Sequence, residues 1–253
     1  MTGMHSLWRR ALAEALGTGL LVTVVVGSGI AAAKLSPGDI GLQLLENSFA
    51  TALGLAVLIL MLGPVSGAHF NPVVSAADWW LGQRDGSGLS LRELAAYVPA
   101  QISGAIAGAI LANLMYGEAA VSWSTTDRTA GHLWIGETVA TAGLIVLIFS
   151  LVWSGRAALA PAAVGAYIGA AYWFTSSTSF ANPAVTIGRA FSDTFAGIAP
   201  SSVPGFVFFQ VFGAILGAGL VVVLYPGLGS AADVVVPHTG TTESESTDSG
   251  VSS

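Results

Sequence analysis

The stretches SGAHFNPV at residues 66–73 and FANPAV at residues 180–185 decide how this chain folds. In each, an Asn-Pro pair opens a short apolar segment, at about 68–81 and about 180–192. Neither segment is long enough to cross a bilayer, which takes about 20 apolar residues in a helix. Proline suits the first turn of a helix, where its missing N–H would be unpaired anyway, and Asn can cap that turn. We therefore predict two short helices that enter the membrane without crossing it.

The composition places most of the chain in a membrane. Of its 253 residues, 53% are hydrophobic and only 9% are charged, whereas about 25% of the residues of a soluble domain are charged. The mean hydropathy is +0.74. The predicted fold class is an all-α membrane protein with six transmembrane helices, two re-entrant half-helices and an inverted three-helix repeat. We place the spans, each long enough for a bilayer, at about 9–33, 43–62, 93–116, 132–153, 158–176 and 204–225.

The two halves of the chain repeat each other. The segment AEALGT at 13–18 is matched by GETVAT at 136–141, and AQISGAI at 100–106 is matched by FQVFGAI at 209–215. Glu, then Asn-Pro, then Gln recur in the same order. Because each half holds an odd number of spans, the second copy must be inverted in the membrane. Inverted repeats place the functional site near the midplane of the bilayer.

The distribution of charge indicates the domain limits and the orientation. We predict an N-terminal cytoplasmic segment at 1–8, a membrane domain at 9–225 with repeats at about 9–116 and 132–225, and a disordered cytoplasmic tail at 226–253. By the positive-inside rule, both termini of this multi-pass protein of the plasma membrane lie in the cytoplasm. The basic residues that fall inside are Arg9, Arg10, Arg84, Arg92 and Arg156, whereas Lys34, Arg128 and Arg189 fall outside.

Several function classes are not expected. The chain has no cysteine, so disulfides and thiolate sites are excluded. The net charge of −6 comes without a basic patch, so no nucleic-acid partner is expected. No nucleophile–base pair, metal-ligand cluster or phosphate-binding loop stands out. We therefore expect no enzyme, no cofactor, no metal site and no use of ATP.

Two acidic residues, Glu14 and Glu137, lie inside predicted spans, where such residues are functional by default. One interpretation is a proton or ion site. The other is a structural acceptor for N–H groups of loop backbone at membrane depth, where lipid offers no partner, and the symmetric repetition favours it. Gln101 and Gln210 are expected to share this support of the loops. His69, just before the first Asn-Pro pair, either lines the inner pore or hydrogen-bonds within its loop.

The boxes Asn71-Pro72-Val73 and Asn182-Pro183-Ala184 resemble the paired Asn-Pro-Ala boxes of the major intrinsic proteins, the aquaporins and aquaglyceroporins. The resemblance covers about 9–225 and implies a channel domain with one pore in each subunit of a homotetramer. The N-terminal ends of the two half-helices carry partial positive charge. Where they meet they favour small neutral solutes over cations, as half-helix dipoles do in aquaporin-type channels.

Two positions depart from the family pattern. The family has Arg directly after the second box, where this chain has Val185, and this implies a wider and less polar wall. The first box ends in Val73 rather than Ala, which adds methyl bulk at the midplane. One helical turn beyond Val185, Arg189 lies on the same face. It either lines the outer vestibule and partly replaces the missing Arg, or it snorkels to the interface or pairs with Asp193.

The other filter positions depend on how the helices before the boxes are aligned. Counting back from the boxes without gaps selects Thr51 and Ala170, with Ser179 as the loop position. Both preceding segments look short against the family pattern, and a gap there would select Leu53 and Tyr172 instead. The predicted filter is therefore Thr51, Ala170, Ser179 and Val185, with Leu53 and Tyr172 as the alternatives.

Val185 and the segment GRAFSDTFAGI at 188–198 resemble a bacterial subgroup associated with arsenic resistance. The resemblance implies a passive channel for small uncharged solutes, namely glycerol-like polyols, metalloid hydroxides such as arsenite, and water. Arsenous acid is an uncharged polyol analogue at neutral pH that needs more width than water. The alternative is a proton-coupled transporter or ion channel that uses Glu14 or Glu137. A membrane adhesion protein with little conduction is a third interpretation.

Overall fold

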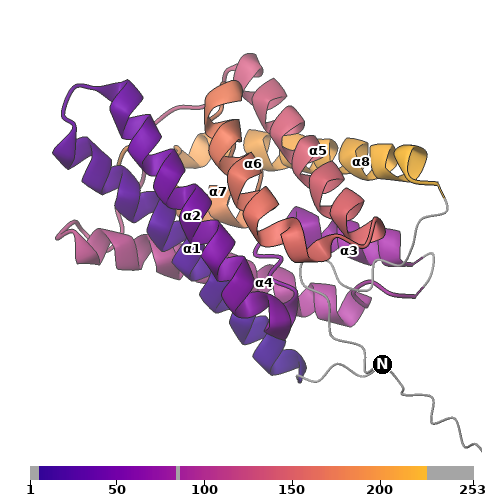
Figure 1. Cartoon of the computed structure of the whole chain (residues 1–253). Helices are drawn as coiled ribbons and strands as arrows, with labels where there is room; N and C mark the ends of the chain where they lie inside the picture. The colour runs from indigo at the N-terminus through magenta and orange to yellow at the C-terminus, as the bar shows by residue number, and fades with distance from the viewer. Residues whose placement is uncertain (1–5, 84–85, 227–253) are drawn as a thin grey trace, which may run out of the picture.

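Six long helices form the body of the molecule (Figure 1). The computed structural model describes residues 6–83 and 86–226, and every regular element within them is helical. The predicted number of membrane spans is confirmed, since 6 helices are long and apolar enough to cross a bilayer. These are α1 (Leu7–Leu35), α2 (Ile40–Ser66), α4 (Leu91–Met115), α5 (Gly131–Trp153), α6 (Ala160–Phe174) and α8 (Val203–Leu224), of which α6 and α8 follow directly on the 3-10 turns η1 (Ala157–Leu159) and η2 (Pro200–Ser202).

Two short helices follow the Asn-Pro pairs, α3 (Pro72–Gly82) and α7 (Pro183–Arg189). With 11 and 7 residues they cannot span a bilayer. The predicted fold class, six spans with two half-helices, is therefore confirmed. Of the predicted N-terminal segment 1–8 and tail 226–253, residues 1–5 and 227–253 lie outside the described residues, as does Arg84, and α1 already begins at Leu7.

Local sequence signals set the helix ends near the pore. The Asp39 side chain accepts a hydrogen bond from Leu42 N (2.9 Å) and caps α2. At its other end α2 stops at Gly67, whose φ of 87° is the left-handed conformation that glycine adopts without strain. Ser90 and Glu93 form a capping box that begins α4. Gly67 therefore marks where the chain leaves α2 and turns towards α3, and the other two signals mark where α2 and α4 begin.

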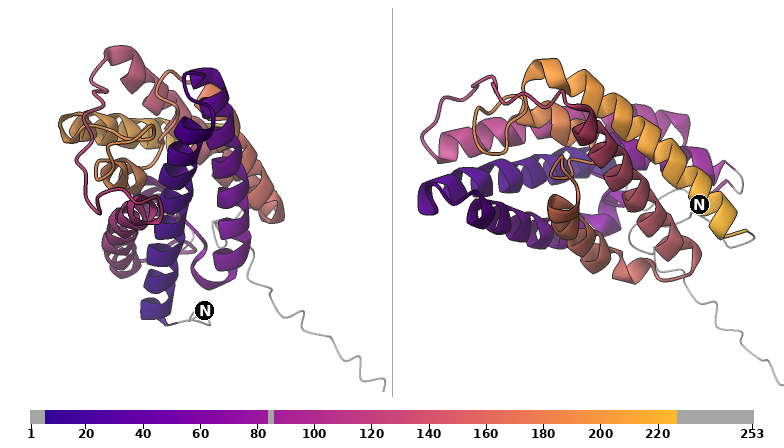
Figure 2. Two further views of the ribbon diagram at one scale, coloured as in Figure 1. Left: turned by 90° about the vertical axis from the view of Figure 1, so that its left-hand side faces the viewer. Right: turned by 90° about the horizontal axis from the view of Figure 1, so that it is seen from above.

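Within each repeat, two long helices cross closely at glycines, and the crossing is built in the same way in both repeats. In the first repeat α1 packs on α4, where a Cβ at Gly104 or Gly108 would lie 2.1 Å from Ala15 O or 2.0 Å from Gly19 O. In the second repeat α5 packs on α8, where a Cβ at Gly213 or Gly217 would lie 2.5 or 2.6 Å from a backbone carbonyl oxygen of α5. Small residues spaced by four allow such backbone contact in membranes. Figure 2 shows the long helices inclined to one another as these crossings require.

The loop before α3 is held by the carboxylate of Glu14, which is fully buried on α1. Its Oε1 accepts hydrogen bonds from His69 N (3.0 Å) and Ser66 Oγ (2.6 Å). Its Oε2 accepts from Phe70 N (2.7 Å) and from Gln101 Nε2 (2.8 Å). Backbone N–H groups that lie outside a helix at membrane depth thus gain partners inside the protein.

The second repeat copies this arrangement around Glu137 on α5. Its carboxylate accepts from Phe180 N (2.9 Å) and Ala181 N (2.8 Å). Gln210 on α8 donates both to Glu137 Oε2 (2.6 Å) and to Thr186 Oγ1 (2.8 Å) on α7. Each glutamate therefore connects a long helix, a re-entrant loop and a glutamine of a third helix.

The re-entrant loops also share an unusual backbone. Ala68 and Phe70 have positive φ angles of 52° and 50°, and Ser179 and Ala181, at the equivalent places before the second box, have 51° and 48°. Residues other than glycine seldom adopt this conformation, which costs about 1–3 kcal/mol each. Such a backbone persists because the hydrogen bonds to the buried glutamates hold it.

Replacing Gly108 by Leu should separate α1 from α4, because overpacking costs about 1–3 kcal/mol or more even where the backbone can shift. We expect a lower unfolding temperature in detergent and less monodisperse protein in size-exclusion chromatography. The matched control is Gly219→Leu on α8, where an added Cβ meets no atom within 4 Å. Equal stability of the two variants would contradict the close crossing.

Replacing Glu137 by Gln should destabilise the second re-entrant loop, because an amide NH2 would face a backbone N–H donor. An unpaired buried N–H costs about 1–3 kcal/mol, so we expect a lower unfolding temperature in detergent and reduced solute flux. Glu118→Gln is the control, since Glu118 makes only an exposed ion pair with Lys34. A Glu137→Gln protein as stable and active as this control would show that the carboxylate does not hold the loop.

Candidate functional site

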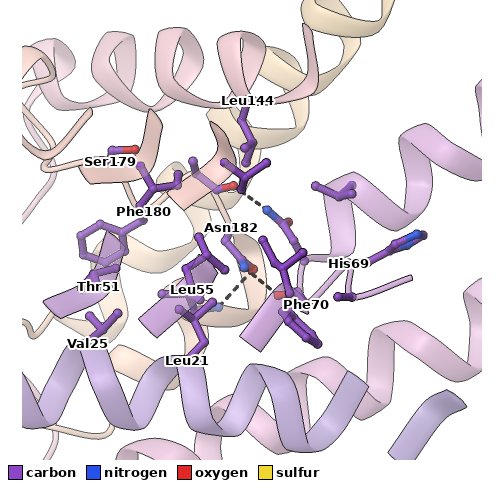
Figure 3. A pocket seen from close by; sticks show the side chains of 18 of the residues that line it. Leu21, Val25, Thr51, Leu55, His69, Phe70, Leu144, Ser179, Phe180 and Asn182 are labelled. Atoms are coloured by element: carbon purple, nitrogen blue, oxygen red, sulfur yellow. Dashed lines mark hydrogen bonds between the residues drawn. The ribbon is translucent and has the colours of Figure 1, made fainter. Parts of the chain in front are cut away.

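The site begins where the loops before the two half-helices meet, and Figure 3 shows Phe70 and Asn182 side by side there. Asn71 Nδ2 donates to Ala181 O (2.8 Å), and Asn182 Nδ2 donates to Phe70 O (2.7 Å). Each asparagine therefore bonds to the backbone just before the other. These reciprocal hydrogen bonds join two segments more than a hundred residues apart and fix the half-helices end to end.

Each asparagine also caps the helix that follows it. Asn71 Oδ1 accepts from Val73 N (3.1 Å), and Asn182 Oδ1 accepts from Ala184 N (3.0 Å) and Val185 N (3.3 Å). Each amide group keeps a second N–H, for which the part of the chain described here provides no acceptor. Both side chains line a cavity, so these donors are available to a solute. The positive ends of both helix dipoles converge on the same place.

The cavity has a volume of about 60 Å³ and passes the asparagine pair on its way between two polar ends. Figure 3 shows His69 towards one end, Thr51 and Ser179 towards the other, and Asn182 between them. Four long helices supply most of its wall through residues spaced by four, which lie on one helix face. The aliphatic members of this wall are Leu21, Val25, Leu55, Ile59, Leu144, Ile148, Val164 and Ile168.

At the end marked by Thr51, the structure corrects one predicted filter residue. Tyr172 lines the cavity, and its hydroxyl lies 3.2 Å from Thr51 Oγ1. Ala170 is exposed on the outside of α6. Two residues apart on a helix point in nearly opposite directions, so only one of this pair can face the pore. On α2 the structure places Thr51 on the cavity wall, whereas Leu53 is 53% exposed.

The loop and box positions of the predicted filter lie on the cavity wall as well. Ser179 lines the cavity, and its hydroxyl is buried without a hydrogen-bond partner among the described residues. Val185 also lines the cavity. Val73 is buried but is not among the residues that line the cavity, whereas Val74, the next residue of α3, is on the wall. The other members of the boxes, Pro72, Pro183 and Ala184, form the first turns of the half-helices behind this wall.

The end of the cavity marked by His69 combines both roles considered for this residue. The His69 ring lines the cavity, and its Nδ1 lies 3.0 Å from Ser75 Oγ on α3. Its ring also packs edge-on against Tyr97, with the centroids 5.6 Å apart. The Tyr97 hydroxyl donates to Ser66 O (2.7 Å) and so ties α4 to the end of α2. The histidine is thus held in place while one side faces the cavity.

Arg189 also lines the cavity and is only 2% exposed. It does not snorkel to a surface, and the part of the chain that the structure describes holds no Arg189–Asp193 ion pair. Asp193 instead accepts hydrogen bonds from Thr125 N (2.8 Å) and Thr125 Oγ1 (3.1 Å). Both forms of that interpretation, an arginine that snorkels to the interface and one that pairs with Asp193, are therefore wrong for this structure.

Sequence patterns singled out the boxes, the glutamates and Arg189, but not most of the wall. The missed residues include Phe180, which lies against Arg189, and the eight aliphatic residues of the four helices. Their four-residue spacing was a usable signal. The sets 51, 55, 59 and 164, 168, 172 also show that Tyr172, and not Ala170, keeps the register of the pore face.

Comparisons with known proteins agree with this geometry. Residues 1–181 match the major intrinsic protein family. Aquaglyceroporin AqpS of Rhizobium meliloti is 50% identical over 214 residues, which cover 85% of this chain and 89% of the relative. The glycerol uptake facilitator protein of Pseudomonas aeruginosa is 31% identical over 254 residues, which cover 85% of this chain and 88% of the relative.

A solved structure shows the same fold. The X-ray structure of the aquaglyceroporin from Plasmodium falciparum matches with a TM-score of 0.62 and 20% sequence identity, over 85% of this chain and 95% of that chain. The family match, the two similar sequences and the paired boxes around a central cavity lead to one conclusion. The chain belongs to the major intrinsic protein family and forms a passive membrane channel for small solutes.

Proposed function

We propose that this channel passes glycerol-like polyols, uncharged metalloid hydroxides such as arsenite, and water. The observation that carries the proposal is Val185, an apolar residue on the cavity wall directly after the second box. A short apolar side chain there leaves more width than a long cationic one. The names of the relatives, an aquaglyceroporin and a glycerol uptake facilitator, support solutes of this size.

The wall suits a molecule with an apolar side and several hydroxyls. Aliphatic side chains form most of its length, and polar groups are confined to the asparagine pair and the two ends. A polyol or a metalloid hydroxide can exchange hydrogen bonds with the amide donors of Asn71 and Asn182 and with the hydroxyls of Thr51, Tyr172 and Ser179. Its carbon skeleton or metalloid centre passes the aliphatic stretches without leaving a charge unsolvated.

The alternative, a proton-coupled transporter or ion channel that uses the buried glutamates, has less support. Glu14 and Glu137 are not among the residues that line the cavity. Both carboxylates accept several hydrogen bonds from backbone and glutamine N–H groups. Protonation would remove an acceptor from each set, so a proton cycle would disturb the loops that form the pore.

The assembly and the orientation complete the proposal. Large apolar side chains are exposed along the outer faces of the long helices, as lipid or neighbouring subunits require. Family membership supports a homotetramer in the plasma membrane, with one pore in each subunit. The excess of arginines on one side supports cytoplasmic termini, a channel domain at 9–225, and a short segment and a tail in the cytoplasm.

Substituting Val185 by Arg should narrow the cavity and add a charge, so arsenite and glycerol flux should fall at least about tenfold while water flux falls less. Reconstituted vesicles under an osmotic gradient give all three rates. Val185→Leu adds bulk without charge and separates the two effects. Wild-type vesicles that pass no arsenite, or Val185→Arg vesicles that pass it unchanged, would refute the proposal.

Substituting Tyr172 by Ala should change the ratio of glycerol to water flux several-fold, because the Tyr172 ring and hydroxyl form part of the cavity wall. The neighbouring change Ala170→Leu, on the outside of the same helix, should leave that ratio unchanged. The two rates are measured in the same vesicle assay. The reverse result would restore the ungapped alignment of α6.

A further inference from the structure

Arg189 is the last residue of α7, and its guanidinium is held in one place on the cavity wall. Its Cζ lies 3.4 Å from the centroid of the Phe180 ring, and its Nε donates to Ala196 O. Phe180 packs edge-on against Phe206, with the centroids 5.1 Å apart. The cation therefore rests on a braced aromatic face, an arrangement that cation–π attraction favours in a desolvated site.

The end of the cavity marked by Ser179 and Thr51 is also the end where this cation lies. Figure 3 shows Phe180, on which Arg189 stacks, beside Ser179 and Thr51. The Ser179 hydroxyl is buried there without a partner among the described residues. Apart from Nε, the guanidinium nitrogens of Arg189 have no protein acceptor within residues 6–83 and 86–226. Donors of Arg189 and an unpaired hydroxyl thus remain for a solute.

No carboxylate forms an ion pair with Arg189 in the described part of the chain. The Glu137 carboxylate is close enough to attract it electrostatically, but both Glu137 oxygens already accept hydrogen bonds from loop backbone N–H groups. In the described part of the chain, the ion pairs are Arg10–Glu93 and Lys34–Glu118. Two aspartates of the outer loops are occupied: Asp193 accepts from Thr125, and Asp127 accepts from Thr129 and Ser202. The hydroxyls of Thr129 and Ser202 also hold the pKa of the Asp127 carboxyl below its ordinary value.

A second cation strengthens the positive potential at this end. The Arg128 Cζ lies 5.0 Å from the centroid of the same Phe180 ring, and Arg128 Nε donates to Gly197 O (3.0 Å). Arg128 does not line the cavity. Arginine side chains keep their proton in proteins, so two fixed positive charges lie near one ring, and Arg189 is the one that a solute meets.

We propose that Arg189 supplies the cation barrier and the solute donors at this end of the cavity, at the position one helical turn beyond Val185. It would repel cations and donate hydrogen bonds to the hydroxyl oxygens of neutral solutes, while Val185 keeps the wall beside it wide. This inference rests on the proposed function of the pore and names the residue that sets its specificity. The channel thereby combines a wider passage with an intact barrier to charge.

Two substitutions separate the charge of Arg189 from its structural hydrogen bond. Arg189→Gln places an amide nitrogen where Nε now bonds to Ala196 O but removes the charge. Arg189→Lys places a charge near the present Cζ but cannot make that bond. A like charge a few ångströms from a permeating cation lowers the probability that the cation enters by about tenfold or more at an intermediate dielectric constant.

The test measures proton and sodium leak, together with glycerol flux, in vesicles that contain the full chain. Arg189→Gln should raise the cation leak about tenfold or more relative to wild type and lower the selectivity for glycerol. Arg189→Lys should keep the leak within a few-fold of wild type. A merely structural role predicts the reverse order, a loss in Arg189→Lys and wild-type behaviour in Arg189→Gln, and that result would overturn the proposal.

Moving the charge provides a second measurement. In the double variant Val185→Arg with Arg189→Gln, the cation leak should return to the wild-type level while glycerol flux stays low. A leak that remains as high as in Arg189→Gln alone would mean that packing, and not charge, forms the barrier. Arg128→Gln removes the second cation, which does not line the cavity, and should raise the leak less than Arg189→Gln does.

The outcomes separate this inference from the proposed function. Glycerol and arsenite flux through the wild-type protein tests the proposed function and does not depend on Arg189 variants. The ratio of cation leak between Arg189→Gln and Arg189→Lys tests the barrier. If the wild-type protein passes the solutes but Arg189→Gln and Arg189→Lys leak cations equally, the role of Arg189 is refuted and the proposed function stands.

Discussion

Backbone N–H groups that leave a helix inside a membrane have no water to bond with, and this constraint shapes the molecule. Two loops enter the interior to present Asn71 and Asn182, so their exposed N–H groups need acceptors from the protein. The buried carboxylates of Glu14 and Glu137 provide these acceptors, and Gln101 and Gln210 hold the carboxylates in turn. Without this support the half-helices would have no fixed position, and the pore would have no defined wall.

The inverted repeat places the same supporting elements on both sides of the pore. Each half supplies a glutamate, a loop with left-handed backbone at equivalent positions, an asparagine cap and a helix crossing at glycines. The asparagines bond reciprocally, so neither half completes the site alone. This explains why the positive ends of both half-helices meet at one point, where they repel cations and leave donors for neutral solutes.

The symmetry breaks at the end of the pore that carries Thr51, Tyr172 and Ser179, and we propose that this end sets which solutes pass. Val185 gives that end an apolar wall, whereas Arg189, one turn further, returns a cation to it. A guanidinium that lies against the Phe180 ring occupies less of the passage than one that points across it. In the proposed pore, width and charge are therefore set by different residues, so a passage for larger neutral solutes would keep its barrier to cations.

The sequence by itself determined the class of fold and the centre of the site. Six apolar runs, two Asn-Pro pairs and a repeated Glu and Gln are local patterns, and each has a physical meaning that needs no neighbours. The sequence also limited the other filter residues to a few alternatives. The ungapped alignment selected Ala170 over Tyr172, because an alignment does not contain the rotation of α6 against the loop that follows it.

Only the tertiary structure decided that rotation and the fate of Arg189. The i+4 spacing placed Asp193 within reach on a continuous helix, but α7 ends at Arg189 and Asp193 lies in the following loop, bonded to Thr125. The arginine instead folds back onto Phe180 and the carbonyl of Ala196. Local spacing fixes which residues share a helix face, whereas contacts between loops far apart in the chain decide which side chains meet a solute.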